Sequence, residues 1–138
     1  MIDIYTAEGV FTPGAESALL RDIHAALAAA TDVTDVPAIS SIIGAILHVV
    51  PRGRYTMGGV AVPGVRIDVA LPAIALASFR RRRRFIRDAT AAVVAAAGDP
   101  SIADRTVVQV FHLVDGGYGI GGVAHTNDEL DEGPDLAE

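Results

Sequence analysis

The sequence predicts a mixed fold of helices and strands, α/β (α+β). Two tandem β-α-β units are expected to form a four-stranded sheet with two helices on one face. The octets "GRYTMGGV" (53–60) and "GGYGIGGV" (116–123) agree at five of eight positions and lie 63 residues apart. The same offset aligns "IDIYT" (2–6) with "VRIDV" (65–69). Both of these segments alternate apolar residues with period two, which is typical of strands. The chain therefore contains two tandem copies of one structural unit.

The first unit begins with the strand predicted over residues 2–6. Thr12 and Pro13 follow as an N-cap and a proline at the first helical position. The helix is then indicated by apolar residues at helical spacing, namely Leu19, Leu20, Ile23, Ala26, Leu27 and Ala30. A second apolar run, "AILHVV" (45–50), closes the unit before the first octet.

The second unit repeats this order from the strand over residues 65–69. Its helix is predicted to bury Phe79, Ile86, Ala89, Val93 and Ala97. The run "VVQVFHLV" (107–114) forms the last strand before the second octet. Strands joined by a crossover helix normally lie parallel. Two such units cover only one face of the sheet, so we expect the chain to assemble with copies of itself.

The chain is predicted to be a single domain over residues 1–124, made of the pseudo-repeats 1–63 and 64–124, followed by a tail. Residues 125–138 hold six of the seventeen carboxylates and no arginine. Because this segment is polar and offers little apolar surface to bury, we expect a flexible acidic tail.

Composition excludes several kinds of chemistry. There is no cysteine, so thiolate catalysis and thiolate metal sites are impossible. All eleven basic residues are arginine, which excludes a lysine Schiff base. The four histidines, at positions 24, 48, 112 and 125, share no metal-ligand spacing, so we predict no metal and no cofactor. No apolar run approaches the roughly 18 residues of a membrane span, and a secretory signal is missing, so a cytoplasmic protein without membrane contact is expected.

A glycine-rich motif and an arginine run resemble ligand-binding motifs, but both are better explained as structural features. "GYGIGG" (117–122) matches a dinucleotide-binding pattern, but "VAHTNDELDEG" follows it where that pattern needs a helix to hold the pyrophosphate, so a glycine-rich hairpin is favoured. The run "RRRRR" (80–84) lies within the second helix of an acidic chain. We interpret it as a solvated helix face, with one of Arg82 and Arg83 turned inward, and we predict no nucleic-acid partner.

The duplicated strand–helix–strand unit, closed each time by the glycine–aromatic turn, resembles the tautomerase superfamily over roughly residues 1–123. The most specific stretch is "VVQVFHLVDGGYGIGG", which is similar to the end of a 4-oxalocrotonate tautomerase unit. The two-unit chain is similar to fused members of that superfamily. The resemblance implies a homotrimer whose sheets enclose a central barrel, with the helices outside.

The resemblance also implies a chemistry that this sequence matches only in part. In the family, an amino-terminal proline moves a proton between the carbons of a 2-oxo acid and its enol, and arginines hold the substrate carboxylates. The proline position falls on Ile2. Because the Ile2 side chain is large, the initiator Met1 that precedes it is predicted to be retained. The family arginine after the first strand falls on Val10. The aromatic residue of the closing turn survives as Tyr55 and Tyr118.

No catalytic residue is therefore assigned. The candidate binding residues for a small carboxylic acid are Arg52, Arg54, Tyr55, His112 and Tyr118. Three interpretations remain open. The chain is a trimer that binds a 2-oxo acid with little or no tautomerase activity, a diverged isomerase or lyase that uses tyrosine and arginine groups, or a non-catalytic interaction protein.

Overall fold

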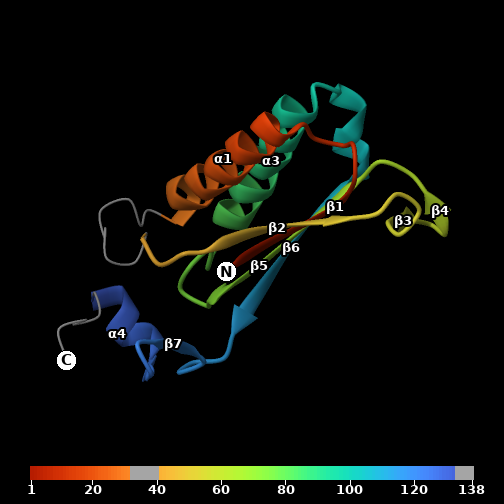
Figure 1. Cartoon of the computed structure of the whole chain (residues 1–138). Helices are drawn as coiled ribbons and strands as arrows, with labels where there is room; N and C mark the ends of the chain where they lie inside the picture. The colour runs from red at the N-terminus through yellow and green to blue at the C-terminus, as the bar shows by residue number, and fades with distance from the viewer. Residues whose placement is uncertain (32–40, 133–138) are drawn as a thin grey trace.

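The computed structural model of the chain describes residues 1–31 and 41–132 and contains the two predicted units in tandem (Figure 1). The first unit consists of β1 (Ile2–Ala7), α1 (Pro13–Thr31), β2 (Ala45–Val50) and the hairpin strands β3 (Thr56–Met57) and β4 (Val60–Ala61). The second consists of β5 (Val65–Pro72), α3 (Phe79–Ala97), the 3-10 helix η2 (Pro100–Arg105), β6 (Thr106–Leu113) and the hairpin strands β7 (Tyr118–Ile120) and β8 (Val123–His125). The short helix α4 (Asn127–Glu132) follows.

The four long strands form one sheet in the order β2-β1-β5-β6, as the repeat predicted. Each crossover pair is parallel, β1 with β2 and β5 with β6, and the two units meet through the antiparallel pair β1 and β5. Ile4 lies opposite Ile67 in that central pair. These are also the residues that the 63-residue repeat equates, so an approximate twofold axis passes between them. The two small hairpins consequently lie at opposite ends of the sheet (Figure 1).

Helices α1 and α3 cover one face of the sheet, and the hydrophobic core lies between the two layers (Figure 1). Alternate residues of the central strands point into it and are fully buried, namely Ile2, Ile4, Val65, Ile67 and Val69. Helix α1 contributes Leu19, Ile23 and Leu27 at the predicted spacing. Each large side chain buried in this way stabilises the fold by about 1.5–3 kcal/mol. None of the helices within residues 1–31 and 41–132 has the length and apolar character needed to cross a membrane.

Helix α3 differs in phase from the prediction. Its buried residues are Phe85, Ala89 and Val93, whereas Ile86 is 38% exposed and Phe79 is 72% exposed. The inward stripe follows i, i+4 spacing from Phe85. Ile86 is therefore turned toward the edge strand β6 and does not enter the core, and our expectation that Phe79 and Ile86 are core residues was wrong.

The C-terminal segment also differs from the predicted flexible tail. Residues 123–125 form β8, and helix α4 follows because Thr126 and Glu129 form a capping box. The Thr126 amide donates to Glu129 Oε2 at 2.8 Å, and the Glu129 amide donates to Thr126 Oγ1 at 3.3 Å. The Asn127 amide donates to Asp115 Oδ1 at 2.6 Å, and Leu130 is only 7% exposed. Residues 133–138 of the predicted tail lie outside the described residues.

Replacing Thr126 with alanine is expected to weaken α4 by about 1 kcal/mol, because the replacement removes the side chain of the N-cap. Hydrogen exchange should show faster exchange of the α4 amides and unchanged exchange in the sheet. The variant Thr90→Ala is the control, since Thr90 Oγ1 donates to Ile86 O within α3 and caps nothing. Equal exchange in α4 of the wild type and of Thr126→Ala would contradict the capping role.

Candidate functional site

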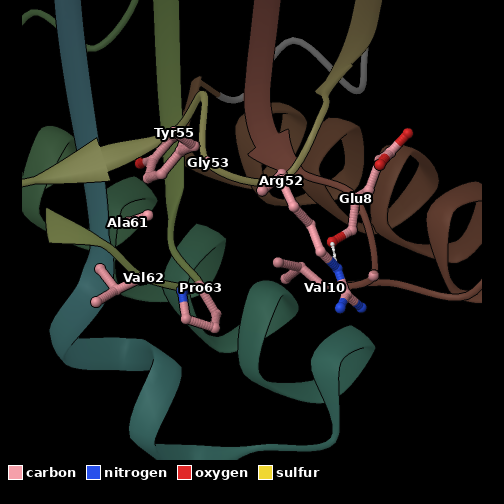
Figure 2. A pocket seen from close by; sticks show the side chains of 10 residues that line it. Glu8, Val10, Arg52, Gly53, Tyr55, Ala61, Val62 and Pro63 are labelled. Carbon is pink, nitrogen blue, oxygen red and sulfur yellow. Dashed lines mark hydrogen bonds between the residues drawn. The ribbon is translucent and has the colours of Figure 1, made fainter.

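A cavity of about 360 Å³ opens where β1 and β2 end and β5 begins (Figure 2). Its walls are mostly apolar and include Val10, Val62 and Pro63. Arg52 and Tyr55, both from the turn after β2, supply the polar groups opposite Glu8 and Gly9. Two of the five residues that the sequence proposed for ligand binding thus line one cavity.

The Arg52 guanidinium lies against the backbone at the end of β1. Its Nε donates to the Glu8 carbonyl at 3.4 Å, and the Glu8 carboxylate is turned away from it (Figure 2). A Cβ at Gly9 would fall 2.6 Å from Arg52 Nη2, and Gly9 has a φ of +85°. The positive φ favours glycine here, and the absence of a side chain leaves space for the arginine. Among residues 1–31 and 41–132, no carboxylate lies within 4 Å of this guanidinium.

Tyr55 is positioned by a second glycine. A Cβ at Gly64 would lie 2.9 Å from Tyr55 Cε1, and the Gly64 carbonyl accepts a hydrogen bond of 3.0 Å from the buried Thr6 hydroxyl. Burial raises the pKa of Tyr55, and the charge of Arg66 opposes this shift only in part. The phenol therefore keeps its proton at neutral pH and can act as a hydrogen-bond donor.

The other arginines near the cavity are already engaged. Arg66 forms a two-pronged ion pair with Asp68, with a 3.0 Å contact from Nε to Oδ1. Arg105 Nε donates to the Pro63 carbonyl at 2.6 Å, and its Nη2 lies 3.8 Å from Asp99 Oδ2. Arg52 thus remains the arginine of the cavity that can receive an anionic ligand.

The sequence matches no family model and no curated protein. Solved structures, however, match it over nearly its whole length. A wild-type fused 4-OT that forms a symmetric trimer superposes with a TM-score of 0.75 at 19% identity, covering 90% of this chain and 94% of that chain. Pt0534 inactivated by 2-oxo-3-pentynoate superposes with a TM-score of 0.75 at 18% identity, covering 94% of this chain and 97% of that chain. The chain has the tautomerase fold.

More distant members of the tautomerase fold also match. FG41 malonate semialdehyde decarboxylase inhibited by 3-bromopropiolate superposes with a TM-score of 0.66 at 16% identity, covering 88% of each chain. Identities this low establish the shared fold and leave the chemistry to be argued from the residues of this chain.

The remaining candidates lie away from the cavity. The Arg54 side chain is exposed and does not line the wall, although Arg54 neighbours Tyr55 in sequence. His112 lies on the edge strand β6, and its Nε2 is 3.1 Å from the Ala75 carbonyl. Tyr118, whose pKa is raised by burial, pairs with His125 in the hairpin at the opposite end of the tautomerase fold. The structure brings Arg52 and Tyr55 together and leaves the other three apart.

The first residue is held in the sheet. The Met1 amino group donates to the Ala70 carbonyl at 3.1 Å, and the Ala70 amide donates to the Met1 carbonyl at 3.0 Å. Burial lowers the pKa of this amino group, and Asp3 opposes the shift. Ile2 follows with its side chain in the core between sheet and helices.

Sequence reasoning missed a polar cluster on the open face of the sheet. His48 Nε2 lies 2.8 Å from Asp3 Oδ1, and the rings of His48 and Tyr5 stack with centroids 4.5 Å apart. The Arg66 guanidinium lies 5.3 Å from the centre of the Tyr5 ring. Period-two alternation does place Asp3 and Tyr5 on the outward side of β1, but their pairing with His48 depends on the β1–β2 register.

Proposed function

We propose that this chain is a tautomerase-superfamily protein that assembles as a homotrimer and binds a small carboxylic acid of the 2-oxo acid type, with little or no tautomerase activity. The observation that carries the binding proposal is the Arg52 guanidinium, which has no carboxylate partner among the described residues and borders an apolar cavity beside Tyr55.

The cavity suits a compact monocarboxylate. A guanidinium donates two parallel hydrogen bonds to a carboxylate, and the neutral Tyr55 phenol supplies a further donor for a 2-oxo group. The apolar walls formed by Val10, Val62 and Pro63 would surround the short carbon body of the ligand. A volume of about 360 Å³ lies at the small end of the range for ligand pockets.

Trimer formation is supported by the open face of the sheet. That face carries exposed apolar side chains, namely Ile46, Val107 and Phe111, around the Asp3–His48 cluster. The fused 4-OT that superposes on this chain is a symmetric trimer. Covering this face with copies of the chain would remove the apolar surface from water.

Replacing Arg52 with glutamine is expected to weaken binding of pyruvate or phenylpyruvate about tenfold or more, since charge-assisted hydrogen bonds contribute roughly 1.5–3 kcal/mol. Calorimetric titration measures the effect. Arg54→Gln is the matched control, because Arg54 is two residues away, carries the same charge and does not line the cavity. If both variants weakened binding equally, the effect would come from the lost positive charge alone, which would contradict a site at Arg52.

Enol-to-keto conversion of phenylpyruvate is expected to barely exceed the buffer rate. The position that the resemblance assigns to the proline is Ile2, whose side chain is buried in the core. A misplacement of a reacting group by about 1 Å can lower the rate about a hundredfold. Strong turnover would contradict the proposal. If that turnover were lost in Tyr55→Phe, the diverged-enzyme interpretation would replace it, with the phenol as the proton-transferring group.

A further inference from the structure

The arginine run is not used by the proposed function, and it borders a hollow of its own. The hollow has a volume of about 990 Å³ and lies between the end of α1 and the amino-terminal half of α3. Its lining consists of Ala30 from α1, the N-cap Ser78, and Arg80, Arg81, Arg83, Arg84 and Arg87. The α1 segment beside it is "AALAAAT" (25–31), whose small side chains leave space next to the long arginines.

The hollow has a large excess of positive charge. Among the described residues, Asp88 pairs with two of its arginines, with Oδ2 at 3.7 Å from Arg84 Nε and Oδ1 at 2.8 Å from Arg87 Nε. Within residues 1–31 and 41–132, Arg80 and Arg83 have no carboxylate within 4 Å. The amino-terminal end of α3 adds the positive end of its helix dipole on the same side.

Arg82 has a different role from its neighbours. Its Nη1 donates to the carbonyls of Leu76 and Ala77 at 2.9 and 2.7 Å, so this side chain is turned back onto the chain before α3. Arg82 is half-buried, so it is the less exposed of the two arginines for which an inward orientation was expected. Arg82 fixes the start of the helix, and the remaining arginines are free of that structural task.

We propose that this hollow is a binding site for a compact multivalent phosphate, that is, a chain of two or more linked phosphate groups. Guanidinium groups match phosphate oxygens in two-pronged geometry, and several of them spaced over two helical turns favour an anion that carries several charges. No aromatic side chain is among the lining residues, so the hollow has no aromatic platform for a nucleobase. Free oligophosphate and the phosphate chain of a nucleotide are therefore expected to bind alike.

The test is calorimetric titration of the full chain with inorganic tripolyphosphate and with ATP, at about 150 mM salt so that weak surface attraction is screened. Both probes should bind with similar dissociation constants. The double variant Arg80→Gln/Arg84→Gln should raise both constants about tenfold or more, since two charge-assisted contacts are lost. A second pair, Arg83→Gln/Arg87→Gln, should have the same effect, and melting temperatures would show whether each variant is folded.

A single variant serves as the control. Arg21→Gln removes an exposed arginine of α1 that pairs with Asp22. It should not change tripolyphosphate binding, and the double variant should leave pyruvate binding unchanged. The proposal is overturned if tripolyphosphate fails to bind, or if Arg21→Gln weakens binding as much as the double variant. Much tighter binding of a single-stranded oligonucleotide would also overturn it, in favour of a nucleic-acid surface.

Discussion

Replacing Phe85 with alanine is expected to lower the free energy of unfolding by about 3–5 kcal/mol. The side chain is fully buried, and it belongs to the core shared by the sheet and both long helices. Truncation would remove its apolar surface and leave a cavity that the strands, fixed by their ladders, cannot close. Denaturant unfolding at a fixed protomer concentration would measure the loss, because assembly also contributes to stability.

The neighbouring residue provides the control. Ile86 is 38% exposed and is turned toward the edge strand, so Ile86→Ala should cost much less than Phe85→Ala. Substituting Arg80, Arg81 and Arg84 with glutamine should likewise cost little stability, since these side chains lie outside the core. Equal losses at Phe85 and Ile86 would mean that the burial of α3 described above is wrong.

Replacing Phe111 with aspartate is expected to convert the proposed trimer into a monomer. Phe111 lies opposite Ala70 in the β5–β6 pair and therefore points to the open face, away from the helices. It is 46% exposed in the single chain, on the face that we propose to be covered by the other subunits. A carboxylate there would have to be buried without a partner charge, which is far more costly than leaving the face in water.

Phe79→Asp is the matched control for this prediction. It introduces the same change at an exposed phenylalanine on the helix layer, on the other side of the molecule from the proposed interface. Light scattering should report a trimer for the wild type and for Phe79→Asp, and a monomer for Phe111→Asp. A wild-type monomer at micromolar concentration, or a trimer in both variants, would contradict assembly through the open face.

The fold was predictable because its information is local and is repeated. Alternation in 2–6 and 65–69, helical spacing after Pro13, and the two turns each depend on neighbouring residues. The phase of α3 was not predictable in the same way. Phe85 and Ile86 are adjacent and both apolar, so either can begin the inward stripe, and packing against the sheet decides between them.

The C-terminal helix was missed for a different reason. The acidic composition of residues 125–138 favoured disorder, but Thr126 and Glu129 stand at capping-box spacing and Leu130 supplies an apolar contact. That spacing was visible in the sequence. The helix start is also held by the Asp115 carboxylate, which accepts a hydrogen bond from the Asn127 amide and lies 12 residues away in the chain.

The candidate site was predictable only where its residues share a turn. Arg52 and Tyr55 both follow β2, so placing one places the other. The glycines beside them lie elsewhere in the chain, Gly9 in the turn after β1 and Gly64 just before β5, and their role depends on a close approach between segments distant in sequence. The same holds for Asp3 and His48, whose contact follows from strand register and from no motif.

The approximate twofold axis between Ile4 and Ile67 has a consequence for binding stoichiometry. The two ends of the sheet are built from equivalent elements, yet one end has Arg52 and Tyr55 in its turn, and the other has Asp115 and Tyr118 in the corresponding turn. A ligand that requires the guanidinium can occupy only the first. Titration with a 2-oxo acid should therefore saturate at one ligand per chain, although the two ends of the sheet are built from equivalent strands.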